Sequence, residues 1–155
     1  MENTFQYILD KLPYEAPFLF VDILTELSET HVEGYYTFKK EEFFYGGHFK
    51  GNPVTPGVIL TECMAQIGLV CLGIYLLAEE SSFEEKNLQI ALSETNVQYL
   101  KKVLPGERVK VVSKKKYFRF GKLKCEVAMF NQNEACVCKG TLSGVLISEN
   151  NGNKE

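Results

Sequence analysis

The sequence has few of the residues that build metal sites or disulfide frameworks. Only two of its 155 residues are histidines, and its five cysteines include no CxxC pair. The cysteines lie in apolar or alternating segments, so we expect small buried thiols in a reducing compartment. Two histidines without ligand spacing give little support to a metal site. The sequence therefore predicts neither a bound metal nor a cofactor.

A signal peptide and a bilayer-length apolar run are also missing from the pattern. The first ten residues include acidic and polar side chains and lack the long apolar core of a signal peptide, so we expect a cytoplasmic protein. The longest uninterrupted apolar run, 67–78, has twelve residues. A helix needs roughly 18 or more apolar residues to cross a bilayer. We therefore expect this run to be a buried helix and not a membrane span.

What is present is the composition of one globular domain with its charges unevenly spread. Apolar residues make up 45% and aromatic residues 12% of the chain, enough for a full core at this length. The net charge is -3, but residues 1–99 hold five lysines against fifteen acidic residues, and residues 100–155 hold twelve basic against five acidic. The basic half could dock an acidic partner or simply be solvated strand surface. The acidic pI of 5.5 and the lack of a recognition module argue against nucleic acid.

The apolar pattern predicts one long central helix. Pro56 suits the first helical position, with Thr55 before it as a cap. From 58 to 78 almost every residue is apolar or small. A helix that is apolar on all sides must be buried on all sides.

Strand patterns flank this helix on both sides of the sequence. The order of expected elements is a short helix, two strands, the long helix and four strands, which indicates an α+β domain whose antiparallel sheet curls around the helix. We expect a single domain over 1–148 and a frayed tail over 149–155. The short helix is expected at 5–11 with Asn3 or Thr4 as its cap, a hairpin over about 18–38, and strands at 88–100, 108–120, 123–130 and 134–147.

One carboxylate stands out on the apolar helix. Glu62 would carry a heavy desolvation penalty on a helix with no polar side, unless it has a partner or stays protonated. A raised pKa is what a general acid needs. Gln66, four residues on, shares its face and could hold the carboxyl group. The alternative is that this turn of the helix protrudes and leaves Glu62 in water.

The second candidate is His48, in the glycine- and proline-rich loop before the helix. Its imidazole has a pKa range suited to taking a proton near neutrality, although a loop histidine can also be a surface or packing residue. His31, near the start of a strand, is expected to be structural. Backbone N–H groups from Gly57 and Val58 onward face out of the helix start and could stabilise an oxyanion. Base, acid and oxyanion donors together suit proton removal beside a carbonyl with loss of a β-substituent.

At these residues the sequence resembles the FabZ-type 3-hydroxyacyl-[acyl-carrier-protein] dehydratases. Gly-His-Phe-Lys-Gly (47–51), Pro-Gly-Val (56–58), Glu62 and Ala-Gln (65–66) stand in the order and register of that family's motif. Weaker echoes lie at 12–22 and 97–106, so the resemblance covers residues 5–147. It implies a hotdog fold, in which an antiparallel sheet wraps around one long buried central helix.

The resemblance also implies the chemistry and the partners. His48 would remove the C2 proton of a 3-hydroxyacyl thioester, Glu62 of a second subunit would protonate the departing hydroxyl, and the Gly57 N–H would hold the thioester oxygen. The product would be a trans-2-enoyl thioester on acyl carrier protein, an acidic partner for the basic half of the chain. The chain would form a homodimer or a trimer of dimers, or a heterodimer with a related dehydratase.

Some positions depart from the family pattern. Lys50 replaces a loop proline, Gly46 and Gly47 together add a residue before His48, and Tyr14 and Glu15 replace a basic pair. These changes favour a specialised pathway, such as polyene or polyketide-like acyl chains, over housekeeping fatty-acid synthesis. Two rival functions stay open: a hotdog thioesterase that uses the helix carboxylate without His48, and a weakly active helper subunit of a heteromeric dehydratase.

Overall fold

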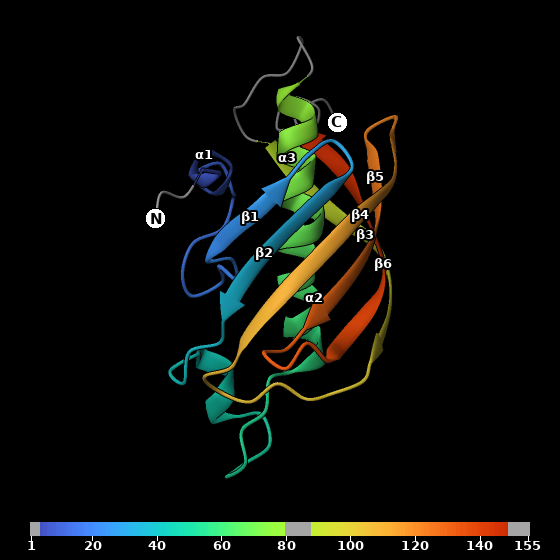
Figure 1. Cartoon of the computed structure of the whole chain (residues 1–155). Helices are drawn as coiled ribbons and strands as arrows, with labels where there is room; N and C mark the ends of the chain where they lie inside the picture. The colour runs from blue at the N-terminus through green and yellow to red at the C-terminus, as the bar shows by residue number, and fades with distance from the viewer. Residues whose placement is uncertain (1–3, 80–87, 149–155) are drawn as a thin grey trace.

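One long helix forms the centre of the computed structural model, which describes residues 4–79 and 88–148. Its three parts, α2 (Gly57–Ala65), η2 (Gln66–Val70) and α3 (Cys71–Ala78), follow one another without a break along the sheet (Figure 1). By length and composition this helix could cross a membrane, but 78% of its most apolar window is buried inside the fold. The sheet thus supplies the apolar surroundings, as the sequence predicts.

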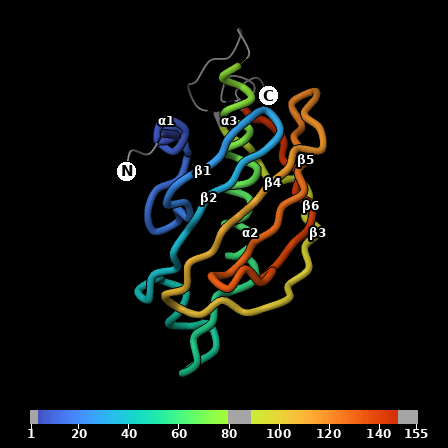
Figure 2. Tube along the Cα trace, in the orientation of Figure 1, coloured from blue at the N-terminus to red at the C-terminus, as the bar shows by residue number. Residues whose placement is uncertain are grey.

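The sheet has six strands in the order β1-β2-β4-β5-β6-β3, and each neighbouring pair is antiparallel. Figure 2 shows its strands curling around the central helix. The predicted α+β architecture is therefore confirmed. The strands are β1 (Ile23–Leu27), β2 (His31–Thr37), β3 (Leu88–Tyr99), β4 (Arg108–Arg119), β5 (Lys122–Phe130) and β6 (Cys136–Ser148).

Alternation along the strands places one apolar face against the helix. Val109 and Val111 of β4 and Leu123, Val127 and Met129 of β5 are at most 2% exposed. The residues between them are half-buried or exposed on the other face. Period-2 patterning therefore predicts the correct inner face for these two strands.

The helix packs closely against the sheet at Gly68, within η2. A Cβ there would lie 3.0 Å from Ser113 Cβ and 3.0 Å from Val127 Cγ1. The buried Ser113 hydroxyl donates a 2.8 Å hydrogen bond to the Gly68 carbonyl. The π-helical turn lies where this carbonyl bonds to the sheet, in line with the usual causes of local helix irregularity.

The starts of the helices differ from expectation. α2 begins at Gly57 with Pro56 as its cap residue, and no side chain caps it. The Thr55 hydroxyl instead hydrogen-bonds to the Tyr45 hydroxyl at 2.6 Å, so its expected capping role is wrong. The first helix, α1 (Gln6–Leu9), is shorter than predicted and has no side-chain cap. Asn3 lies outside the described residues.

The chain over 16–22 is not a strand, contrary to prediction. Its backbone bonds to a side chain, because the Phe20 N–H donates to Gln66 Oε1 at 2.8 Å and Gln66 Nε2 donates to the Phe18 carbonyl at 3.1 Å. The hairpin is therefore only β1 and β2. On β3, the apolar Leu92 is 44% exposed beside an irregularity in the β3–β6 register. The predicted tail over 149–155 lies outside the described residues.

Candidate active site

His48 is held in a loop that two hydrogen bonds close. The loop follows the 3₁₀ helix η1 (Phe43–Gly46) and ends at α2. The bond between the Tyr45 and Thr55 hydroxyls joins its two ends. Within it, His48 Nδ1 lies 2.8 Å from the Val54 carbonyl oxygen, and the ring stacks on Phe49 at 4.4 Å between centroids. The imidazole is half-buried and fixed in one orientation.

The Val54 contact determines which ring nitrogen can act as a base. A carbonyl oxygen only accepts hydrogen bonds, so Nδ1 of His48 carries the proton and donates it to Val54. In the neutral ring Nε2 then has the free lone pair. His48 is therefore arranged to take a proton through Nε2.

Glu62 is held by the neighbour that the helical spacing predicts. Gln66 Nε2 donates to Glu62 Oε2 at 3.0 Å. Gln66 itself is fully buried, and its oxygen and its nitrogen also bond to the backbone of Phe20 and Phe18. The amide therefore has a fixed orientation, and it fixes that of the carboxyl group.

The surroundings of Glu62 favour its protonated form. Burial raises the pKa of its carboxyl group, and the hydrogen bond from Gln66 only partly opposes this. Tyr14 lies close by: burial first, and then the charges of Glu62 and Cys71, raise the pKa of its phenol to about 12. Glu62 is thus neither in open water nor neutralised by a cation among the described residues, and it has the properties of a proton donor.

The start of α2 forms a third element of the site. The ring of Tyr99, on β3, lies 3.2 Å from where a Gly57 Cβ would be, so only glycine fits without displacing it. The Tyr99 hydroxyl shares a short hydrogen bond with the Thr61 hydroxyl, one turn further along the helix. The first backbone N–H groups of a helix have no partner within the helix. Those of Gly57 and Val58 are therefore available to a ligand oxygen.

A surface pocket joins His48 to the start of α2. Its volume is about 520 Å³, and Lys101 and Lys102 lie at its rim. Glu62 does not line it, and the hydrogen bonds found for His48 and Glu62 in the described chain go to different partners. One chain thus brings His48 and Gly57 together but does not bring Glu62 to them. The other lining residues are Phe49, Val54, Thr55, Leu60, Tyr99 and Leu100.

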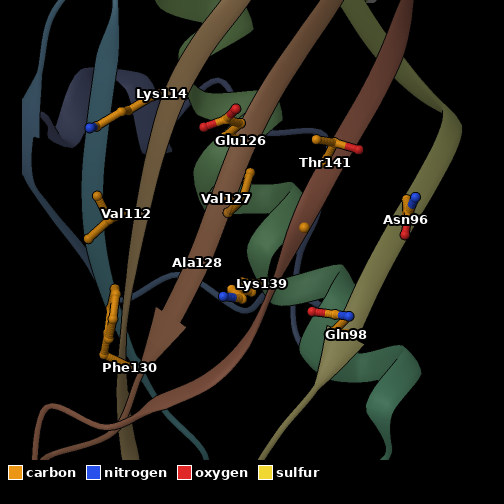
Figure 3. A pocket seen from close by; sticks show the side chains of 11 residues that line it. Asn96, Gln98, Val112, Lys114, Glu126, Val127, Ala128, Phe130, Lys139 and Thr141 are labelled. Atoms are coloured by element: carbon orange, nitrogen blue, oxygen red, sulfur yellow. The ribbon is translucent and has the colours of Figure 1, made fainter.

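A larger pocket, of about 600 Å³, lies away from these residues (Figure 3). Apart from Val127, its lining residues on β4 and β5 alternate with the buried ones and therefore belong to the face of the sheet turned away from the helix. It contains none of the predicted site residues. Its labelled lining residues include Val112, Lys114, Ala128, Phe130 and Lys139.

His31 has a structural environment, as predicted. Its Nε2 lies 2.8 Å from Glu33 and 3.6 Å from Glu26. These three residues are close enough to share a cation. Glu33, however, already pairs with Lys110 at 3.0 Å. Burial alone would raise the pKa of Glu33, but hydrogen bonds from Lys110 and His31 outweigh it and hold the pKa below its usual value.

Sequence reasoning missed three residues of the site. Tyr99 comes from a strand more than forty residues beyond Gly57, and Tyr14 from the opening segment. Thr61 lies next to Glu62 on the helix. The one available signal was a polar residue at 61 on an otherwise apolar helix. Its partner across the fold could not be found from spacing.

Comparisons with known proteins identify the family of this chain. A family profile described as a FabA-like domain matches residues 12–139. The chain is 35% identical over 107 residues to a 3-hydroxyacyl-[acyl-carrier-protein] dehydratase FabZ of Bacillus velezensis, covering 68% of this chain and 72% of the relative. A FabZ of Geobacter metallireducens is 34% identical over 114 residues, which cover 72% of this chain and 73% of the relative. A bifunctional LpxC/FabZ enzyme of Porphyromonas gingivalis is 38% identical over 100 residues, 64% of this chain, which span 21% of that enzyme.

Solved structures support the fold. The dehydratase heterocomplex ApeI:P from Xenorhabdus doucetiae matches with a TM-score of 0.75 at 15% identity, covering 92% of this chain and 92% of that chain. A hypothetical thioesterase from Streptococcus pneumoniae, solved with coenzyme A, matches with a TM-score of 0.61 at 15% identity. The match covers 93% of this chain and 94% of that chain. The fold is therefore the hotdog fold of thioesterases and dehydratases. Given the profile match over most of its length and these relatives, the chain belongs to the FabA-like family.

Proposed function

We propose that this protein dehydrates 3-hydroxyacyl thioesters carried on acyl carrier protein to trans-2-enoyl thioesters. The observation that carries the proposal is that a FabA-like chain holds both an imidazole of fixed orientation and a carboxyl group whose pKa is raised by burial. His48 is oriented by Val54, and Glu62 by Gln66. The relatives named FabZ at 34–38% identity support the same reaction class.

The reaction needs one base, one acid and one oxyanion site. His48 Nε2 removes a proton from C2 of the substrate, and the backbone N–H groups of Gly57 and Val58 stabilise the charge that develops on the thioester oxygen. The double bond forms between C2 and C3 as the C3–O bond breaks. Glu62 gives its proton to the departing hydroxyl, which leaves as water. Proton exchange with solvent then returns both side chains to their starting states.

Two subunits complete each site in this proposal. His48 and Gly57 share a pocket that Glu62 does not line. In the described sheet β3 pairs only with β6, so its other edge is open over twelve residues. Long open edges favour pairing with another chain. A second copy docked there would bring its own Glu62 to the His48 pocket.

The carrier docks beside the same pocket. Lys101 and Lys102 are exposed at its rim, and they match the negative charge of an acidic carrier. Carrier docking would therefore be a function of part of the basic second half of the chain. The organisation is a homodimer or trimer of dimers, with a related dehydratase as the alternative second subunit, in the cytoplasm.

The test is mass spectrometry of 3-hydroxyacyl carrier protein after incubation with the enzyme. Wild type removes one water. His48→Ala and Glu62→Gln each slow this by about 10²–10⁴-fold, the usual contribution of a general acid or base. His31→Ala, the other histidine, is the matched control and keeps its activity. Release of free acid, or full activity in His48→Ala, would indicate a thioesterase and contradict the proposal. Turnover only with a related subunit would indicate a helper chain.

A further inference from the structure

The tip of the β4–β5 hairpin carries an aromatic side chain that nothing in the fold covers. Phe120 is 100% exposed. Arg119 pairs with Lys122 across the hairpin, so Phe120 and Gly121 form a two-residue turn. Single exposed apolar residues are common on soluble proteins, so the exposure of Phe120 gains meaning only from its backbone conformation and its charged surroundings.

The backbone of this turn makes the choice of phenylalanine more unusual. Phe120 has φ 52° and Gly121 has φ 72°, both in the left-handed region. Two-residue turns of this kind favour Asn-Gly, because asparagine tolerates positive φ and bulky residues do not. The tip is nevertheless well held, since the Leu146 N–H donates to the Gly121 carbonyl at 2.7 Å. The strained backbone at Phe120 therefore lowers the stability of the fold, and the exposed side chain makes no packing contacts with the described residues to offset this.

The hairpin is also the most basic part of the chain. Residues 114–126 hold six basic residues and one acidic residue, a local charge of +5 in a protein whose net charge is -3. The one acid, Glu126, pairs with Lys116 at 2.8 Å. Arg119 lies over the Tyr117 ring at 4.4 Å, with its charge kept close to the tip. Two further apolar side chains, Val145 and Ile147 on the adjacent end of β6, are each 39% exposed.

The tip and the candidate active site lie at opposite ends of the molecule. Figures 1 and 2 show the orange β4–β5 turn at one end and the teal loop before α2 at the other. A carrier docked at the tip would not be beside the His48 pocket. The tip is also projecting and basic, so the tips of two copies of this chain would repel each other.

We propose that the 119–122 tip docks on an anionic membrane surface, with Phe120 inserted between lipid headgroups and the surrounding cations facing them. A projecting aromatic residue ringed by lysine and arginine matches such a surface in both polarity and charge. Because the rest of the chain is acidic, an anionic bilayer attracts the hairpin end and repels the remainder. Docking would leave the His48 pocket turned away from the lipid. This role is independent of the reaction proposed above.

The test is co-sedimentation of the full chain with lipid vesicles. Wild type binds vesicles that contain phosphatidylglycerol, binds pure phosphatidylcholine vesicles far less, and loses binding as salt rises past about 0.15 M. Lys122→Gln weakens binding about fivefold, the typical effect of one cation near an anionic surface. Phe120→Asn weakens it about tenfold or more, while its melting temperature is equal to or above that of wild type because asparagine suits the turn.

The melting temperature distinguishes a variant that has lost the membrane contact from one that has lost its fold. Phe43→Asn, at a phenylalanine 57% exposed near the other end, is the matched control and binds vesicles as wild type does. Equal vesicle binding by wild type and Phe120→Asn overturns the proposal. So does a change of oligomeric state in Phe120→Asn without vesicle binding, which would assign the tip to a second copy. Loss of carrier binding alone would assign it to an acidic protein.

Discussion

Glu62 is the residue at which function and stability oppose each other. Its carboxyl group is partly withdrawn from water, has one amide donor and has no cation beside it among the described residues. Such a group costs free energy whenever it is ionised. A proton donor needs this environment, so the cost is consistent with a site selected for chemistry.

The first prediction concerns the pH dependence of stability. Burial raises the pKa of Glu62 in the folded state, so the folded protein binds more protons than the unfolded one over the range between the normal and the raised value. The free energy of unfolding therefore falls as pH rises through this range. Glu62→Gln removes that fall and raises the melting temperature at pH 7 by roughly 2–4 °C for each kcal/mol relieved.

Thermal denaturation between pH 4 and 8 measures this effect. Glu126→Gln is the control, because the pKa of Glu126 is lowered by Lys116 and its contribution has the opposite sign. An unchanged pH profile in Glu62→Gln would show that the carboxyl group is solvated and ionised in the folded protein.

At the scale of elements, the placement of β3 depends on one glycine of β6. A Cβ on Gly140 would lie 1.9 Å from the backbone oxygen of Asn96 and 2.8 Å from its carbonyl carbon. Backbone atoms cannot move aside as a flexible side chain can. The close approach of β6 to β3 thus requires glycine at this position.

Gly140→Ala is therefore expected to separate β3 from β6 and to lower the free energy of unfolding by about 3 kcal/mol or more. Chemical denaturation measures the loss. Gly46→Ala, at a glycine with open space around its Cβ position, is the matched control and should change stability by no more than about 0.5 kcal/mol. Equal stability of the two variants would mean that β3 does not lie as described.

At the scale of the whole molecule, the proposed reaction predicts that two chains complete each site. Glu62 does not line the His48 pocket, and Leu92 and Tyr99 on the open-edged strand β3 are 44% and 50% exposed. A two-fold pairing across that edge would complete two equivalent sites.

Subunit mixing tests this arrangement. When His48→Ala and Glu62→Gln chains are co-expressed, half of a random population is mixed dimers, and each mixed dimer has one intact site. Activity should therefore return to about a quarter of wild type. Each variant alone supplies the control. No recovery in mixed dimers isolated with two different tags would place His48 and Glu62 of one site in the same chain.

The sequence by itself determined the architecture of this protein. An apolar helix without a polar side must be buried on all sides, and the alternating strands before and after it in the sequence offer the apolar faces to cover it. The inner faces of β4 and β5 follow from period-2 patterning, and the contact of Gln66 with Glu62 follows from helical spacing. Glu62 was visible because a carboxylate is rare on an apolar helix, whereas His48 became a strong candidate through the resemblance of its loop to the family motif.

The tertiary structure decided the contacts between distant segments. The chain over 16–22 has strand-like composition, yet its backbone bonds to the buried Gln66 amide, which no local pattern reveals. Three further contacts likewise depend on how the sheet closes around the helix. They are Tyr99 with Gly57, Val54 with His48, and Tyr14 with Glu62. Local periodicity determines which face of an element is buried, whereas the partners on that face are set by the packing of the whole chain.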